Sequence, residues 1–250
     1  MNENLVIQTL LNRRSIRKFK SKEVSKVDME SIVNAGQRAP TGTMFQAYSF
    51  INISDPRIKE EIIQIILTFA SKKEGRWWQV METAPLWILI CVDFARQEKI
   101  FEILNLDIEL GPLDKLVRGL IDANLAAENM VIAAESLGLG SCFVGYPKRI
   151  SGELVESLGL PESVFPFLLL CIGYPDEDPS IKTRLPINAV LHENGYQAPS
   201  EKLLKSYYES SYGSLDKVGS SWGFNFPLEA TRWREQKLRK DIKSMGLLNG

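Results

Sequence analysis

The chain has 250 residues, of which 44% are hydrophobic and 24% charged, and its formal net charge is -1. This composition is that of a globular protein with a sizeable core, and it excludes a disordered chain. The 30 basic and 31 acidic residues argue against a general nucleic-acid or anionic-membrane surface, which needs a surplus of positive charge on one face.

The first predicted elements are two short helices. Leu5, Leu10 and Leu11 begin an amphipathic helix that ends at the arginines of the segment "RRSIRKF". The next helix follows Ser25 as its N-cap and stops before Pro40. No basic segment precedes the first apolar residues, and no apolar run approaches the roughly 18 residues that cross a bilayer, so we expect a cytoplasmic protein with no membrane partner.

Three strands and one long helix are predicted further along. The strands are "YSFINIS", "LWILICVDF" and "FPFLLLCIGYP", and the second is apolar on both faces, as a central strand is. Residues 113–137 form the helix, which ends at Gly138. Its second half is apolar nearly all round, so it must be buried in the domain or against a partner subunit, which is a first indication of a dimer.

The sequence becomes polar and rich in turns from about Pro186, and a basic helix with Leu238, Ile242 and Met245 on one face follows. We predict one α+β domain over residues 1–250, with a core of about 5–196 and a C-terminal excursion and helix of about 197–250 whose charges face water. Cys91, Cys142 and Cys171 lie in apolar runs and are interpreted as reduced core thiols, with a reactive role as the alternative. The single histidine, His192, is expected in a loop.

The segment "RRSIRKF" gathers four cations and one hydroxyl, groups that bind a phosphate by charge-assisted hydrogen bonds. Extended alternation places Arg13, Ser15 and Arg17 on one side and Arg14 and Lys18 on the other. Solvated surface charge is the alternative. A second cationic pair favours the phosphate site, because Lys182 and Arg184 stand two residues apart in a loop after a core strand.

Two glycine-containing loops follow from the sequence, and small residues in the first of them let the backbone approach a flat ligand closely. Residues 39–50, "APTGTMFQAYSF", form a turn that leads into a strand, with Gln46 at the junction. Residues 136–147, "SLGLGSCFVGYP", pass from a helix end into a short strand and another glycine, without the spacing of a dinucleotide fingerprint or a P-loop.

These motifs, in this order, resemble the nitroreductase family, and most closely its branch of NADPH-dependent flavin reductases and oxygen-insensitive nitroreductases. The resemblance covers about residues 8–196. It implies a nitroreductase-like fold, with a central mixed β-sheet surrounded by helices, in a homodimer.

The resemblance also implies the cofactor, FMN, and the residues that bind it. Those for the phosphate and ribityl chain are Arg13, Arg14, Ser15, Arg17, Lys182 and Arg184. Thr41, Gly42 and Gln46 would reach the FMN of the other subunit. The backbone of Phe143, Val144, Gly145 and Tyr146 would face the isoalloxazine, and Gln79 is a further candidate contact. No protein acid or base is implied for hydride transfer.

The expected activity is hydride transfer from NADPH or NADH through flavin N5 to a small-molecule acceptor: a nitroaromatic, a quinone or free flavin. The donor stays open, since only Lys217 is basic where the branch carries arginines for the NADPH phosphate. Two alternatives remain. One is a flavin-binding or redox-sensing module with slow turnover, and the other is a specialised dehalogenase-like member of the same fold.

Overall fold

The computed structural model describes residues 4–70, 76–108, 110–221 and 228–248. They form two compact units, the first of Met1–Pro179 with Glu235–Gly250 and the second of Ser180–Arg234. The second unit therefore contains the first part of the expected excursion together with residues 180–196, which the sequence analysis placed in the core. Residues 222–227 of the excursion lie outside the described residues.

A four-stranded sheet forms the centre of the first unit, in the order β1-β2-β4-β3. Its strands are β1 (Tyr48–Asn52), β2 (Leu86–Asp93), β3 (Gly140–Val144) and β4 (Val164–Gly173). All three strand pairs are antiparallel. The sheet was expected to be mixed, and in the described residues its parallel component is the isolated bridge between Ser15 and Ser141.

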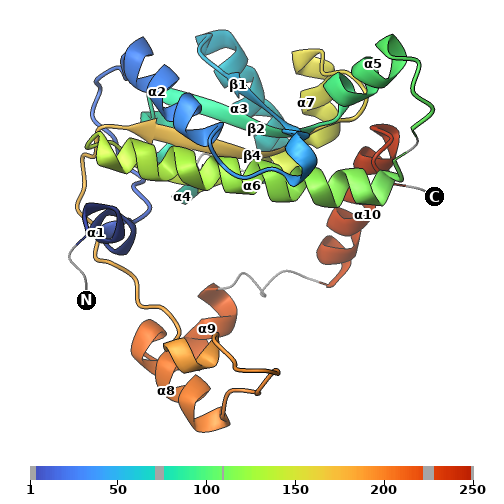
Figure 1. Ribbon diagram of the computed structural model, residues 1–250. Coiled ribbons are helices and arrows are strands. Elements are labelled where there is room, and N and C mark those ends of the chain that lie inside the picture. Colours follow the sequence, from blue (N-terminus) through green and yellow to red (C-terminus); the bar gives the residue numbers. More distant parts are fainter. Residues whose placement is uncertain (1–3, 71–75, 109, 222–227, 249–250) are drawn as a thin grey trace. The chain divides into compact units, whose positions relative to one another are not determined.

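Helices cover both faces of this sheet, because β2 and β4 carry apolar side chains on both sides. Ile88, Ile90 and Val92 of β2 belong to one buried cluster, and Trp87, Leu89 and Cys91 belong to the other. The first cluster is closed by α2 (Lys26–Gly36) and α6 (Pro112–Ser136), and the second by α3 (Pro56–Ala70), α4 (Arg76–Thr83) and α7 (Ser151–Leu158). Figure 1 shows α6 running along one face of the sheet.

The remaining elements are short or peripheral. In the first unit they are α1 (Leu5–Asn12), the 3-10 turns η1 (Gly42–Met44) and η2 (Pro147–Arg149), and α5 (Ala95–Ile103). The second unit holds η3 (Ile187–Ala189), α8 (Glu201–Tyr212), α9 (Asp216–Ser221) and the start of α10 (Leu228–Ser244). Ser25 caps α2 by accepting from the backbone N–H of Asp28, as predicted. No helix among the described residues is long and apolar enough to cross a membrane.

Helix α6 buries one face and leaves an apolar stripe outside. Ala123, Ala126 and Met130 are fully buried on the sheet side. Leu113, Val117, Ile121 and Leu125 recur every four residues, and between 42% and 60% of each is exposed. Helix α1 packs against α6 and buries none of its residues, although it is rich in leucine. The two helices thus present apolar surface that the described residues of the first unit leave exposed.

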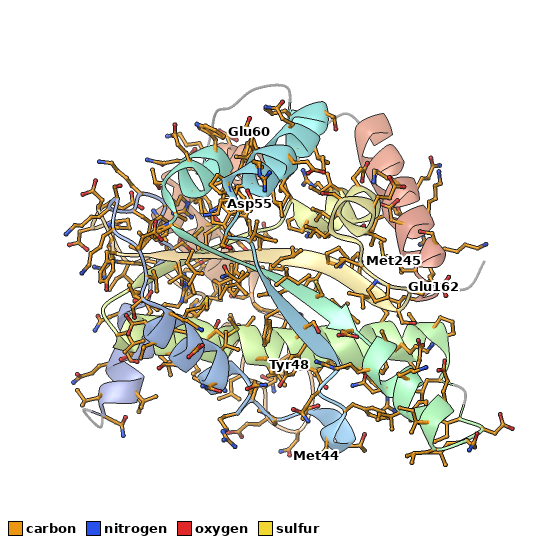
Figure 2. The ribbon with its side chains drawn as sticks, turned by 90° about the horizontal axis from the view of Figure 1, so that it is seen from above. Met44, Tyr48, Asp55, Glu60, Glu162 and Met245 are labelled. Atoms are coloured by element: carbon orange, nitrogen blue, oxygen red, sulfur yellow. The ribbon has the colours of Figure 1, made fainter. Side chains whose placement is uncertain are left out.

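The C-terminal residues of the first unit close against the sheet and α7. Ile242, Met245 and Leu247 are buried, and the carbonyl of Met245 accepts from the N–H of Ser163 at 3.0 Å. Figure 2 shows Met245 beside Glu162 at this contact. The charges of α10 were expected to lie in water, but Lys237 is only 17% exposed and pairs with Asp241 at 2.6 Å and Glu153 at 2.8 Å. Carboxylates on the packed surfaces draw this lysine inward.

Candidate active site

The basic segment is held in an extended conformation by β3 and by the residues after β4. Ser15 forms a parallel bridge with Ser141, and the N–H of Ile16 donates to the carbonyl of Ser141 at 2.9 Å. Gly140 permits this approach, because a Cβ there would lie 2.5 Å from Cγ1 of Ile16. Ile16 and Phe19 are buried as anchors, so the polar residues between and before them are fixed in place.

Alternation along this segment separates Arg14 and Lys18 from Arg17, as predicted. Arg14 forms an ion pair with Asp178, and Lys18 pairs with Asp176 at 2.8 Å. The hydrogen bond from Lys18 lowers the pKa of Asp176. Arg17 has its N–H bonded to Glu177 and its guanidinium 3.2 Å from the carbonyl of Ser15. Sequence reasoning missed the acidic run of residues 176–178, and its only signal was the letters "DED" after a core strand.

Arg13 and Arg14 also act on a carboxylate of α6. Burial raises the pKa of Glu135, while both arginines lower it. One carboxylate oxygen of Glu135 and Nε of Arg14 are buried and have no hydrogen-bond partner within the described residues. The described residues therefore leave two strongly polar atoms unsatisfied, one on the basic segment and one on α6.

A cavity of about 310 Å³ opens between this segment, α4, β3 and η2. Its walls contain five of the predicted site residues: Arg17, Phe143, Val144, Gly145 and Tyr146. The other lining residues are Trp77, Val80, Cys142, Lys148 and Arg149. The structure thus joins two motifs that lie more than a hundred residues apart in the sequence.

Aromatic rings form one wall of this cavity. The rings of Trp77 and Tyr146 have centroids 5.1 Å apart, and the Arg149 guanidinium carbon lies 5.3 Å from the Tyr146 centroid. Gln79, the predicted contact on α4, is exposed and is not among the lining residues, where Trp77 and Val80 stand instead. Burial raises the pKa of the Cys142 thiol, so this cavity residue stays protonated near neutral pH.

The second predicted loop is organised by a buried carboxylate that the sequence analysis did not identify. Asp122 of α6 is 3% exposed and accepts hydrogen bonds from the Thr41 hydroxyl, from the Gly42 N–H at 3.2 Å and from the Ala47 N–H at 3.2 Å. The Thr41 hydroxyl oxygen accepts in turn from the N–H of Gln46 at 2.8 Å.

These bonds hold the loop in an unusual conformation. Thr43, Met44 and Gln46 all have φ between 50° and 61°, a left-handed region that costs free energy for residues other than glycine. Figure 2 shows Met44 at the turn before β1, and Met44 is 75% exposed. Thr41, Gly42 and Gln46 line none of the cavity described above. Their predicted role is toward the other subunit, and it stays a prediction.

Lys182 and Arg184 belong to the second unit, which is described by itself. The Arg184 guanidinium lies 3.2 Å from the carbonyl of Lys182 and 3.3 Å from that of Thr183. Arg184 also lines a cavity of about 600 Å³ against α8, with Lys202 and Tyr207. The convergence of Lys182 and Arg184 with the basic segment of the first unit stays a prediction.

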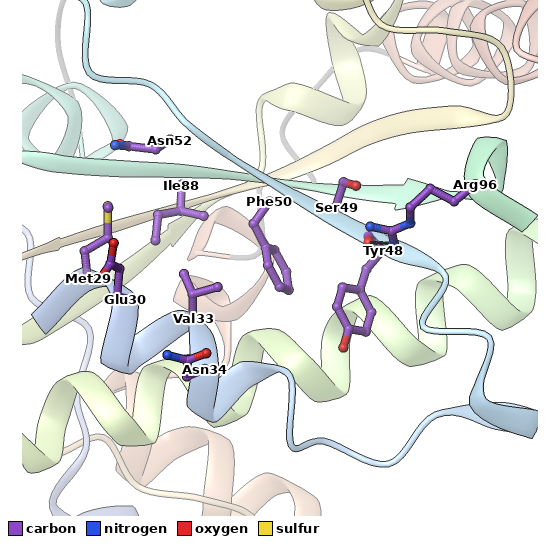
Figure 3. A pocket seen from close by; sticks show the side chains of 10 residues that line it. All are labelled: Met29, Glu30, Val33, Asn34, Tyr48, Ser49, Phe50, Asn52, Ile88 and Arg96. Atoms are coloured by element: carbon purple, nitrogen blue, oxygen red, sulfur yellow. Dashed lines mark hydrogen bonds between the residues drawn. The ribbon is translucent and has the colours of Figure 1, made fainter. Parts of the chain in front are cut away.

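A larger cavity, of about 540 Å³, lies between α2 and β1 and contains none of the predicted residues. Figure 3 shows its lining, with Val33 of α2 facing Phe50 of β1. Arg96 lies at one end and donates to the backbone carbonyls of Gln46 and Tyr48. Arg96 is the one cation among the described lining residues of this larger cavity, whereas the smaller cavity has three.

The fold and the cavity match known proteins. The model of the nitroreductase family matches residues 10–174. The chain belongs to the nitroreductase family. It is 32% identical over 225 residues to the NADPH-flavin oxidoreductase of Vibrio harveyi, and the aligned region covers 88% of each chain. It is 35% identical over 203 residues to the oxygen-insensitive NADPH nitroreductase of Salmonella typhimurium, and the aligned region covers 81% of this chain and 79% of that protein.

A solved structure of the same family has a closely similar fold. The NADPH:FMN oxidoreductase from Vibrio harveyi in complex with NAD+ superimposes with a TM-score of 0.81 at 28% identity, covering 97% of this chain and 98% of that one. This nitroreductase chain therefore shares the fold of its relative over nearly its whole length.

Proposed function

We propose that the chain is an FMN-dependent oxidoreductase that transfers reducing equivalents from NADPH or NADH to nitroaromatics, quinones or free flavin. The observation that carries the proposal is the joining of Arg17 with residues 143–146 around one cavity. The names of the relatives, which combine NADPH, flavin and nitro reduction, support it.

The residues present fit an FMN molecule. Arg13, Arg14, Ser15 and Arg17 supply forked cationic donors and a hydroxyl, the groups that bind a phosphate. The buried, unpartnered Nε of Arg14 is a donor that awaits an acceptor. A Cβ built on Gly145 would have the Lys148 ammonium as its nearest described neighbour, at 4.0 Å. The cavity surface beside the rings of Trp77 and Tyr146 is therefore open to a flat ring.

The protein's own residues would bind and orient FMN and the substrates, and none of these residues needs to exchange a proton. When bound, FMN supplies the two-electron chemistry, so that NAD(P)H, a proton and a quinone yield NAD(P)+ and a hydroquinone. The cations at the cavity stabilise negative charge through electrostatics that are fixed before the reaction. Trp77 and Tyr146 pack together in the cavity wall and would exclude water from that side of a bound ring.

The working form in this proposal is a homodimer. The stripe of Leu113, Val117, Ile121 and Leu125 on α6, together with α1, is exposed apolar surface of the kind that a second copy covers. A second copy would also present its loop of residues 41–46, whose polar groups line none of the cavity in their own chain.

Steady-state kinetics test the proposal. The FMN-loaded protein should oxidise NADPH or NADH in the presence of 2-methyl-1,4-naphthoquinone, with parallel lines in double-reciprocal plots, since the donor must leave before the acceptor enters the shared cavity. A protein that holds FMN but turns over no acceptor would instead favour the binding-module alternative.

A further inference from the structure

Glu135 is a carboxylate beside the basic segment that the proposed binding of FMN does not use. It stands in the last turn of α6, and the chain continues from there into β3, which pairs with the basic segment at Ser141. We propose that Glu135 belongs to the phosphate end of the FMN site and takes up a proton from solvent when the phosphate binds beside Arg13 and Arg14. This inference rests on the proposed function and deepens it, because it couples FMN binding to pH.

The position of Glu135 disfavours its negative charge. The last turn of a helix carries the negative end of the helix dipole, which destabilises a carboxylate. The side chain is partly buried, and burial raises its pKa above its ordinary value of 4.5. One of its oxygens is buried and has no hydrogen-bond partner within the described residues. A proton on this oxygen would remove the charge and supply a hydrogen-bond donor.

Arg13 and Arg14 favour the ionised form of Glu135. Among the described residues, these two are the charged groups that shift its pKa, and both lower it against the effect of burial. Arg14 also forms an ion pair with Asp178. A phosphate bound by the two arginines would neutralise their charge and bring a like charge close to the carboxylate. Both changes raise the pKa of Glu135.

The unpartnered Nε of Arg14 complements the unpartnered oxygen of Glu135. Both atoms are buried, and the two side chains are close enough for Arg14 to shift the pKa of Glu135. Phosphate oxygens accept hydrogen bonds both from an arginine N–H and from the O–H of a carboxylic acid. One phosphate would therefore satisfy both atoms, but only when Glu135 is protonated, because an ionised carboxylate has no proton to donate.

FMN affinity should fall as the pH rises through the titration of Glu135. Below the pKa of the free protein the proton is bound with or without FMN, and above the pKa of the complex it is bound in neither state. Between these two values FMN binding takes up a proton, and a pKa difference of about one unit raises the Kd about tenfold across the window. The second ionisation of the phosphate, near about pH 6, acts in the opposite direction because arginines bind a dianion more strongly.

The test measures the Kd of FMN for the wild type and for Glu135→Gln, by fluorescence titration of the apoprotein from about pH 5 to about pH 9. Glutamine is the neutral analogue of a protonated glutamate, and the ratio of the two Kd values at each pH cancels the titration of the phosphate. Riboflavin, which has no phosphate, is the second ligand. The control is Glu128→Gln, which removes an exposed carboxylate from the same helix.

We expect the wild type and Glu135→Gln to bind FMN alike at the acidic end, and the variant to bind it about tenfold more tightly at the alkaline end. Calorimetry in two buffers of different ionisation enthalpy should show that the wild type takes up more protons than Glu135→Gln when it binds FMN. Riboflavin should show neither difference, and Glu128→Gln should behave as the wild type does.

A ratio of Kd values that is the same at every pH would indicate a structural role alone and overturns the inference. So does a Glu135→Gln variant that binds FMN more weakly than the wild type at the alkaline end, or a ratio for riboflavin that changes with pH as much as that for FMN. Each of these results leaves the proposed function standing. A wild-type protein that binds no FMN overturns the proposed function and the inference with it.

Discussion

Arg17 is the residue at which the basic segment reaches the cavity. Its neighbours Arg14 and Lys18 face the acidic run after β4, and Arg17 alone among these three lines the cavity. The alternation of side chains was predictable from the sequence, because it needs only an extended backbone. The acidic partners were not, since ion pairs between residues 160 positions apart leave no local pattern.

Replacing Arg17 with alanine should weaken FMN binding. Loss of a charge-assisted contact of roughly 1.5–3 kcal/mol corresponds to a Kd higher by about tenfold to a hundredfold. Fluorescence titration of the apoprotein with FMN measures this. Arg57→Ala is the matched control, because Arg57 is 90% exposed on α3 and pairs only locally with Asp55. An unchanged Kd for Arg17→Ala would remove Arg17 from the phosphate site.

Asp122 supports the strained loop of residues 41–46. In Asp122→Asn an amide N–H₂ would face at least one of three donors, so the variant should lose about 1–3 kcal/mol of unfolding free energy. Urea unfolding checks this, with the exposed Asp114→Asn on the same helix as control. Equal stability of the two variants would show that the loop does not depend on Asp122.

The elements themselves were largely predictable. The apolar run of β2, the Ser25 cap and the length of the helix before Gly138 all follow from local periodicity and capping. The pairing of the strands was harder, because a sheet expected to be mixed has antiparallel named strands whose partners are distant in sequence. The second half of this helix was expected to be buried in the domain or against a partner subunit. In α6, Ala126, Met130 and Ala134 of the second half are buried, and the exposed apolar stripe of residues 113–125 precedes them.

This stripe gives a prediction for the assembly. If the proposed dimer forms through this stripe, Ile121→Glu together with Leu125→Glu should convert it to a monomer and weaken FMN retention, because charge would be buried at the interface. Analytical ultracentrifugation and the flavin content of the purified protein measure both effects. Val27→Glu, on an α2 residue that is 72% exposed, is the control. A variant that stays dimeric would place the interface elsewhere.

At the scale of the molecule, the chain leaves its first unit after Pro179 and returns at Glu235. The sequence changes character at about Pro186, after the loop of Lys182 and Arg184, and the excursion was expected from about residue 197. Both residues belong to the second unit, yet the resemblance assigns them to the same phosphate site that it predicts for the basic segment of the first unit.

A double-mutant cycle decides whether the two units share one phosphate. If Arg17 and Arg184 contact the same group, the FMN affinities of Arg17→Ala, Arg184→Ala and the double variant should be non-additive, with a coupling of about 0.5–3 kcal/mol. Strict additivity would contradict a shared phosphate site.

The return of the chain is fixed by Lys237 between Glu153 and Asp241. Burial lowers the pKa of Lys237, but the hydrogen bonds with the two carboxylates outweigh it and raise the pKa above 10.5. Lys237→Met should cost on the order of 1–3 kcal/mol by removing the charged partner of Asp241, whose side chain is 10% exposed and keeps its hydrogen bonds from Ser151 and Gly152. Because the pKa of Lys237 is raised in the folded protein, the wild-type advantage should be complete below about pH 10, near the pKa of an unfolded lysine. It should disappear as the pH rises through the higher pKa of the folded state. Urea unfolding against pH, with Lys240→Met as control, measures this, and a pH-independent difference would contradict the ion-pair account.

The most direct test of the central claim is an anaerobic absorbance spectrum of the FMN-loaded protein, followed by titration with NADPH and, separately, with NADH. The proposed function predicts a flavin spectrum that one equivalent of at least one donor bleaches rapidly, and oxidised flavin that returns when a quinone is added. A protein that cannot be loaded with FMN, or bound flavin that neither donor reduces, would contradict it.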